Sequence, residues 1–242
     1  MYTYKKYEKN FINYAHRGAS EYLPENTLLA FYTGVFMKAN GIETDVRRTK
    51  DGVLVLFHDK TLERVTGDLR SVEECTLDEL MALDVKKDEY SDKIVVFEDF
   101  LKKFAFRDLV FAIELKGEGV EKETADLLRK YGMEKKAVIT SFQLDYIKNF
   151  IAYAPEFEFG LLTKEVTPEI EEELLALGAT EICPRATLMS AEDVDRWHKM
   201  GFRVRAWGVK DEEIMKFAYD AGVDGMTCNF PDKLYDYINA KC

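Results

Sequence analysis

Two short segments of this 242-residue chain hold most of its residues that could do chemistry. The first contains His16 and Arg17, and the second contains Glu43, Asp45 and His58, so two of the three histidines of the chain lie here. On a β-strand, residues i and i+2 point to the same side, which would place the two carboxylates next to each other. Paired carboxylates suit a hard divalent cation and imidazoles suit proton transfer. Together they indicate cleavage of a phosphoester.

Alternative interpretations exist for these charged groups. Glu43 and Asp45 could form a solvated strand edge, but their neighbours Ile42 and Val46 are apolar, which favours metal ligation. Glu114 and Lys116, on one face of a later strand, could be a buried ion pair without a catalytic role. The third histidine, His198, lies in a polar helical stretch and is predicted to be on the surface.

Composition limits the class of protein. The formal net charge of −11 argues against nucleic acid or an anionic membrane as the main partner, so an anionic substrate would need a local metal, Arg or Lys. The four cysteines are scattered and favour isolated thiols over a zinc site or a disulfide framework. The chain shows no apolar leader or membrane-spanning run, which predicts a cytoplasmic location. With no low-complexity linker, residues 1–242 are expected to form a single catalytic domain.

Short β-rich runs alternate with amphipathic helical stretches along the chain. Eight such runs are predicted as strands: Phe11–Ala15, Ile42–Val46, Val110–Leu115, Ala137–Thr140, Phe157–Leu161, Glu181–Cys183, Phe202–Trp207 and Gly225–Thr227. Eight βα units in a chain of this length predict an α/β fold of the TIM (β/α)8 barrel type. The alternative, an open doubly wound sheet, lacks a Gly-rich phosphate loop after the first strand.

A ninth apolar run, Val53–Phe57, follows the second strand too closely to be its parallel neighbour. Asp51-Gly52 instead predicts a hairpin, so this run is expected to be an antiparallel excursion after strand two. Among the helices, Thr76 and Glu79 predict a capping box and Pro231 predicts the first turn of a last helix.

The strand at 202–207 allows two arrangements. If Trp207 points into the pocket, Arg205 points into the barrel and must pair with a carboxylate. If Val204 and Ala206 fill the barrel instead, Trp207 packs against the outer helices. We favour the first arrangement, with Trp207 lining a substrate-binding wall.

The order of these motifs resembles the glycerophosphodiester phosphodiesterase family, in particular its short bacterial cytoplasmic type. The resemblance covers nearly the whole chain, and its first half is the more specific. It is carried by His16-Arg17-Gly18-Ala19, Pro24-Glu25-Asn26-Thr27, Glu43-x-Asp45, Thr49-Lys50-Asp51-Gly52, His58-Asp59, Glu114-x-Lys116, Ser141-Phe142, Gly160-Leu161-Leu162, Trp207-Gly208-Val209, Gly222-Val223-Asp224-Gly225 and Asn229-Phe230-Pro231-Asp232.

The resemblance implies a TIM barrel that hydrolyses glycerophosphodiesters to glycerol 3-phosphate and an alcohol, with one divalent cation, Mg²⁺ or Ca²⁺. By matched position it implies three groups of site residues: metal ligands Glu43, Asp45 and Glu114, an acid/base pair His16 and His58, and phosphate or substrate contacts Arg17, Lys116, Phe142 and Trp207. It leaves open which histidine is the acid, and whether water or a glycerol hydroxyl of the substrate attacks first.

The chain departs from the family pattern at a few positions. The family commonly has W-T-V-N where this chain has Trp207, Gly208, Val209 and Lys210, a difference that bears on substrate fit rather than on the chemistry. The expected partner is a small glycerophosphodiester, with a second copy of the chain as a candidate homodimer partner. Two other functions remain open: a lysophospholipase D acting on lipids, and an inactive barrel that serves as a binding protein.

Overall fold

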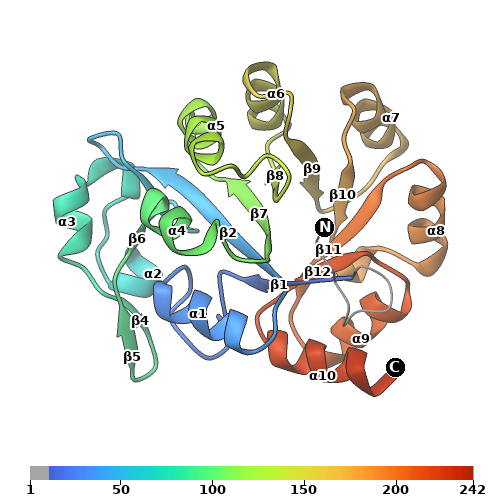
Figure 1. Cartoon of the computed structure of the whole chain (residues 1–242), viewed down its shortest axis with the longest axis horizontal. Helices are drawn as coiled ribbons and strands as arrows, with labels where there is room; N and C mark the ends of the chain where they lie inside the picture. The colour runs from blue at the N-terminus through green and yellow to red at the C-terminus, as the bar shows by residue number, and fades with distance from the viewer. Residues whose placement is uncertain (1–10, 242) are drawn as a thin grey trace.

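Eight parallel strands close into a barrel in the structure, a computed structural model that describes residues 11–241 (Figure 1). Around the barrel the strands are β1 (Ile12–His16), β2 (Gly41–Arg48), β7 (Val110–Leu115), β8 (Ala137–Ser141), β9 (Glu158–Thr163), β10 (Glu181–Pro184), β11 (Arg203–Val209) and β12 (Gly225–Cys228). Parallel pairing of β1 with both β12 and β2 closes the ring. The predicted TIM barrel is therefore confirmed, and each predicted strand lies within two residues of the observed one.

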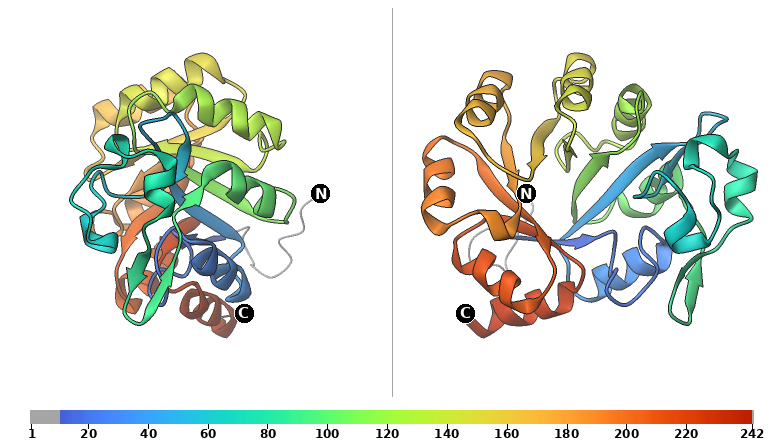
Figure 2. Two further views of the ribbon diagram at one scale, coloured as in Figure 1. Left: turned by 90° about the vertical axis from the view of Figure 1, so that its left-hand side faces the viewer. Right: turned by 180° about the vertical axis from the view of Figure 1, so that it is seen from behind.

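Helices connect the strands and form an outer layer, which the two further views in Figure 2 show from the side and from behind. The connecting helices are α1 (Leu28–Phe36), α4 (Phe97–Phe104), α5 (Glu121–Lys130), α6 (Leu144–Tyr153), α7 (Pro168–Leu177), α8 (Ala191–Lys199), α9 (Glu212–Asp220) and α10 (Pro231–Lys241). Several begin at side-chain caps: the Ser190 hydroxyl accepts from the Asp193 amide, and an Asp211 carboxylate accepts from the Ile214 amide. Pro231 opens α10 as predicted.

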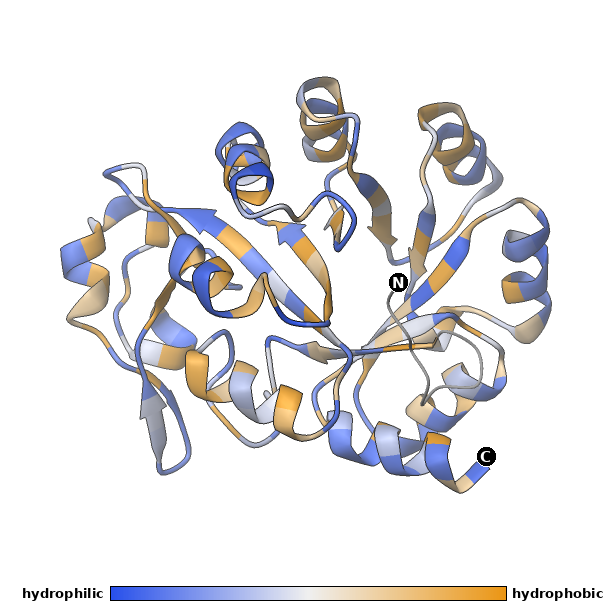
Figure 3. Ribbon diagram, in the orientation of Figure 1, coloured by the Kyte–Doolittle hydropathy of each residue, from blue (hydrophilic) through white to orange (hydrophobic). Residues whose placement is uncertain are grey.

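The core lies between the barrel and these helices. β2 is buried along both faces, as expected for a parallel strand covered by helices on one side and by the barrel interior on the other. Helix α4 places Phe100 and Phe104 on one face, where both rings contact Phe31 of α1. In Figure 3 the helices carry hydrophobic and hydrophilic stretches in alternation, the pattern of elements with one buried face.

The excursion after β2 is confirmed and is larger than a hairpin. β3 (Leu54–Leu56) pairs antiparallel with β2, and β6 (Val95–Val96) pairs antiparallel with β3. Between them lie α2 (Glu63–Thr66), a 3-10 turn (Val72–Glu74), α3 (Leu77–Met81), β4 (Val85–Lys87) and β5 (Tyr90–Asp92). This segment has a small apolar core of its own, which contains Val55, Leu62 and Leu80. The Thr76–Glu79 capping box opens α3 as predicted.

Cys75, Cys183 and Cys228 are buried free thiols, as predicted, and Cys242 lies outside the described residues. No helix in the range 11–241 has both the length and the apolar character needed to cross a membrane.

Candidate active site

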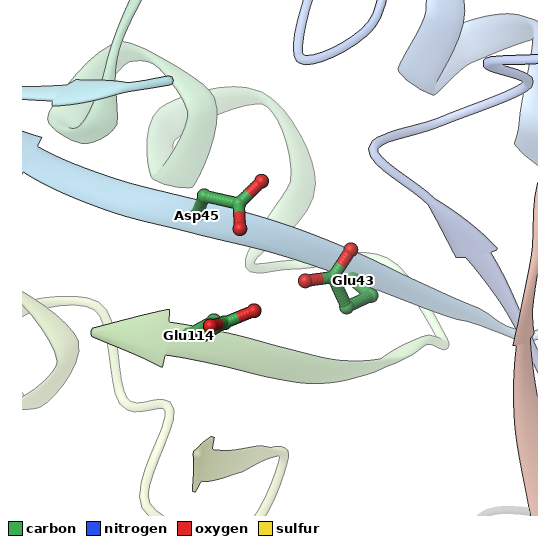
Figure 4. A group of neighbouring side chains, drawn as sticks. All are labelled: Glu43, Asp45 and Glu114. Atoms are coloured by element: carbon green, nitrogen blue, oxygen red, sulfur yellow. The ribbon is translucent and has the colours of Figure 1, made fainter. Parts of the chain in front are cut away.

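Three carboxylates meet at the carboxyl end of two neighbouring strands. Glu43 and Asp45 lie on β2 and Glu114 lies on β7, where it pairs in register with Asp45 (Figure 4). All three are buried, and one oxygen of each lies within 4.8 Å of the others. The i and i+2 carboxylates of β2 share one face, as predicted. Parallel pairing of β2 with β7 brings the Glu114 carboxylate beside them.

Cations and an amide surround Asp45. Arg17 Nε lies 3.1 Å from Asp45 Oδ2, and Asn26 Nδ2 donates to the same oxygen at 2.9 Å. Lys116 Nζ lies 2.7 Å from a Glu114 oxygen and 3.7 Å from Asp45 Oδ1. The ion pair considered for Glu114 and Lys116 is therefore present, and it is part of this cluster.

The turn after β1 holds Arg17 in a conformation that favours glycine. Arg17 has a φ of 56°, and its amide donates to the Glu43 carbonyl at 2.9 Å. The next residue, Gly18, has a φ of +85°, and a Cβ there would lie 2.4 Å from the Ala30 carbonyl carbon. Only glycine fits between this turn and α1. Backbone strain of this kind is concentrated at functional sites.

The charges of the cluster are not balanced by its own cations. Burial together with the nearby Asp45 charge raises the pKa of Glu43 well above its ordinary value, and the same causes raise the pKa of Glu114 to about 7. Burial acts in the same direction on Asp45, but Arg17, His58 and Lys116 lower its pKa. Two cations, Arg17 and Lys116, thus face three carboxylates.

The residues fit a divalent cation on two further observations. Asp45 Oδ1 is buried and accepts no hydrogen bond from any described residue, so one ligand atom lacks a donor. The donor set is also all oxygen, which suits Mg²⁺ or Ca²⁺. We conclude that Glu43, Asp45 and Glu114 could hold a metal ion.

The two histidines differ in their hydrogen-bond partners. His16 Nδ1 lies 2.6 Å from Asn229 Oδ1, and His58 Nδ1 lies 2.7 Å from Asp59 Oδ1. With an oxygen acceptor at each Nδ1, the neutral ring carries its proton there and leaves the Nε2 lone pair free. Burial, with a contribution from Arg17, lowers the pKa of His16 to about 3, and burial also lowers the pKa of His58.

A cavity of about 510 Å³ opens over this cluster. Phe142 and Trp207 also line it, with ring centroids 4.9 Å apart in an edge-to-face arrangement. The residues that line the cavity are His16, Arg17, Glu43, His58, Glu114, Lys116, Phe142, Leu162, Lys164, Arg205, Trp207, Gly208, Val209, Lys210, Thr227 and Asn229. Asp45 is fully buried and is not one of them.

The structure decides between the two arrangements considered for β11. Arg205 is buried inside the barrel and donates to Glu181 at 2.8 Å, while Trp207 lines the cavity and donates to the Thr163 carbonyl at 3.1 Å. The first arrangement is observed. His198 is exposed, as predicted, and its Nε2 lies 2.8 Å from Asp224 Oδ2.

All nine residues singled out from the sequence come together at one end of the barrel. Sequence reasoning assigned no role to Asn26, Asp59 or Asn229, although each stands in a motif that it quoted. Adjacency to His58 was a signal for Asp59. By contrast, the contacts of Asn26 and Asn229 depend on packing between elements distant in sequence.

Comparisons with known proteins agree with this geometry. A model of the "Glycerophosphoryl diester phosphodiesterase family" matches residues 16–233 of the chain. The chain is 32% identical over 231 residues to a Bacillus subtilis protein described as "Uncharacterized protein YqiK", an alignment that covers 91% of this chain and 95% of the relative. It is 31% identical over 233 residues to a glycerophosphodiester phosphodiesterase of Caldanaerobacter subterraneus, covering 93% of this chain and 96% of the relative.

A solved structure has the same fold. A phosphodiesterase of Oleispira antarctica, determined in complex with the product sn-glycerol-3-phosphate, superposes with a TM-score of 0.86. The match covers 94% of this chain and 96% of the other, at 24% sequence identity.

Proposed function

Because this chain belongs to the glycerophosphoryl diester phosphodiesterase family, we propose that it hydrolyses glycerophosphodiesters to glycerol 3-phosphate and an alcohol by metal-dependent acid/base catalysis. The observation that carries the proposal is the meeting of three carboxylates, two histidines and two cationic side chains at one end of the barrel, all but the buried Asp45 lining one cavity. In such barrels the carboxyl ends of the strands are where active sites lie.

The phosphodiester would bind at the carboxylate cluster. Glu43, Asp45 and Glu114 would hold one Mg²⁺ or Ca²⁺, which when bound supplies positive charge to polarise the phosphoryl group. Arg17 and Lys116 add fixed positive charge on the same side, and both are held by ion pairs to the carboxylates. They stabilise the charge that develops on the phosphoryl oxygens in the transition state.

The unequal partners of the histidines suggest a division of labour. His16 faces the neutral amide of Asn229 and lies beside Arg17, so it stays unprotonated and its Nε2 can take a proton from the attacking hydroxyl, whether of water or of the substrate's glycerol. His58 donates to the Asp59 carboxylate, which favours its protonated form and opposes the lowering of its pKa by burial. His58 would therefore give its proton to the departing alkoxide as the bond from phosphorus to the alcohol oxygen breaks.

Phe142 and Trp207 would form the wall that receives the organic part of the substrate. They present apolar surface to the cavity, and the hydrogen bond from Trp207 Nε1 to the Thr163 carbonyl fixes the indole. A glycerol backbone placed between this wall and the cluster would have its phosphate next to Arg17 and Lys116.

The direct test is detection of glycerol 3-phosphate released from glycerophosphocholine and glycerophosphoethanolamine. Wild type and His16→Ala are assayed with added Mg²⁺ or Ca²⁺ and again with EDTA. Release that requires both the metal and His16 is the expected result. Release that EDTA leaves unchanged contradicts the metal assignment, and no release from wild type with metal supplied contradicts the proposal as a whole.

A further inference from the structure

Three basic residues occupy equivalent places at the far side of the cavity, and two of them, Lys164 and Lys210, line it. Lys164, Arg185 and Lys210 are each the first residue after a strand, namely β9, β10 and β11. These three strands are consecutive neighbours in the barrel and run parallel, so the three residues follow the same edge of the sheet. We call this group the basic wall.

The basic wall is not neutralised by its surroundings. Within residues 11–241, neither lysine of the wall forms an ion pair or a side-chain hydrogen bond, and the buried Nε of Arg185 has no acceptor. The carboxylates that line the described cavity, Glu43 and Glu114, both stand on the opposite side, in the metal cluster. In a chain with a net charge of −11, Lys164 and Lys210 at the cavity, with Arg185 on the strand between theirs, are a local concentration of positive charge.

The aromatic residues between the two sides do not offer a site for a cationic alcohol. An ammonium group such as that of choline is often held on aromatic faces. Here Lys116 Nζ already lies 5.4 Å from the centroid of the Phe142 ring, and the Arg185 guanidinium lies 5.9 Å from that of Trp207. Each ring thus already has one of the protein's own cations near it, and a further cation would meet like charge.

The positions at which this chain departs from the W-T-V-N pattern are at this wall. Lys210 stands where that pattern has Asn. Gly208, in place of Thr, has a φ of +74°, and a Cβ there would lie 3.4 Å from Arg185 Cγ. The glycine takes a backbone conformation that side chains rarely adopt, next to the Arg185 side chain and to the isolated parallel bridge between Arg185 and Trp207.

We propose that the basic wall selects glycerophosphodiesters whose leaving alcohol carries a second anionic group, such as another phosphodiester. This inference rests on the proposed function and names its substrate class. The reacting phosphate lies at the carboxylate cluster and the second anion at Lys164, Arg185 and Lys210. Water is added across the bond between phosphorus and the alcohol oxygen, which yields glycerol 3-phosphate and the anionic alcohol.

Two diesters that differ in whether the leaving alcohol carries a second phosphodiester test the proposal. Bis(glycerophospho)glycerol, which is deacylated cardiolipin, releases glycerol 3-phosphate with an alcohol that bears a phosphodiester anion, whereas glycerophosphoglycerol releases neutral glycerol. Glycerophosphocholine adds a cationic alcohol. kcat/KM is measured for all three in wild type, in Lys164→Gln/Lys210→Gln, and in Lys86→Gln, an exposed lysine of β4 outside the cavity, as the matched control.

We expect wild type to prefer the anionic leaving group over glycerophosphocholine by about tenfold, since a few exposed charge pairs contribute modestly each. The preference should weaken with added salt. It should fall to about twofold or less in the double variant and should persist in Lys86→Gln.

Equal kcat/KM for the three substrates in wild type, or a preference that survives the double variant, would overturn the inference while leaving the proposed function intact. Failure of the proposed function looks different, because wild type with metal would then cleave none of the three diesters.

Discussion

The two sides of the cavity differ in how their charged groups are held. On the side of β1, β2 and β7, each carboxylate, histidine and cation contacts another charged group or a buried amide, and Asp45 is fully buried. On the side of β9, β10 and β11, Lys164 and Lys210 are exposed, and within residues 11–241 they have no ionic partner. The first side has the fixed, mutually oriented groups that a reaction needs. The second has charges left free to meet a ligand.

This difference suggests that reaction and selectivity occupy separate strands of one barrel. The chemical groups come from the first half of the chain, where the family resemblance is most specific, and the basic wall comes from the second half, where it is looser. Substitutions on the first side should therefore lower kcat/KM on every diester, whereas substitutions on the second side should change the preference among diesters.

The largest loss should follow removal of a histidine from the first side. His16→Ala is expected to lower kcat/KM by about 10²–10⁴-fold on every diester alike, because it removes a proton acceptor. His198→Ala is the matched control, since it removes the exposed histidine paired with Asp224. Steady-state rates of glycerol 3-phosphate release measure both. A loss confined to anionic alcohols would contradict the separation of the two sides.

The stability of the fold should depend strongly on Arg205, which lies buried at the floor of the cavity. Arg205 is buried with Glu181, and its guanidinium also lies 5.2 Å from the centroid of the Tyr14 ring. Arg205→Met leaves a buried carboxylate without its cation and should lower the free energy of unfolding by about 3–5 kcal/mol. Lys130→Met, which breaks an exposed pair with Glu98, should change it by only about 0–1 kcal/mol. Urea denaturation measures the free energy of unfolding of both variants. Similar losses in the two would contradict the importance of the buried pair.

Metal binding should depend on pH, since the pKa of Glu114 is raised to about 7 by burial and by Asp45. A carboxyl with a raised pKa stabilises the metal-free fold at low pH, and that contribution is lost as the pH rises through about 7. A bound cation must displace this proton, so metal affinity should fall about tenfold per pH unit below pH 7. Calorimetric titration at pH 5.5, 6.5 and 7.5 measures it, and a pH-independent affinity would contradict the raised pKa.

The barrel was predictable because its strands read as short apolar runs at regular spacing, and Asp51-Gly52 marked the hairpin that breaks the count. The extent of the excursion after β2 was not predictable, because its small core of Val55, Leu62 and Leu80 depends on contacts among short elements with weak periodicity.

Within the site, strand alternation predicted that Glu43 and Asp45 share a face. It could not predict that Asn26 and Asn229 would reach Asp45 and His16, since those contacts span loops. The basic wall could not be predicted from the sequence either. Lys164, Arg185 and Lys210 are far apart in sequence, and only closure of the barrel brings the ends of their strands to one edge.

Measuring metal binding and catalysis together tests most directly whether the carboxylate cluster holds the metal that the reaction needs. Metal-stripped wild type and Asp45→Asn are titrated with Mn²⁺ while bound metal and glycerol 3-phosphate release are measured on the same samples. In wild type, activity should rise with bound metal to a plateau at one ion per chain. Asp45→Asn should neither bind the ion nor gain activity. Full activity before metal is added, or wild-type protein that binds no ion, would contradict the metal assignment.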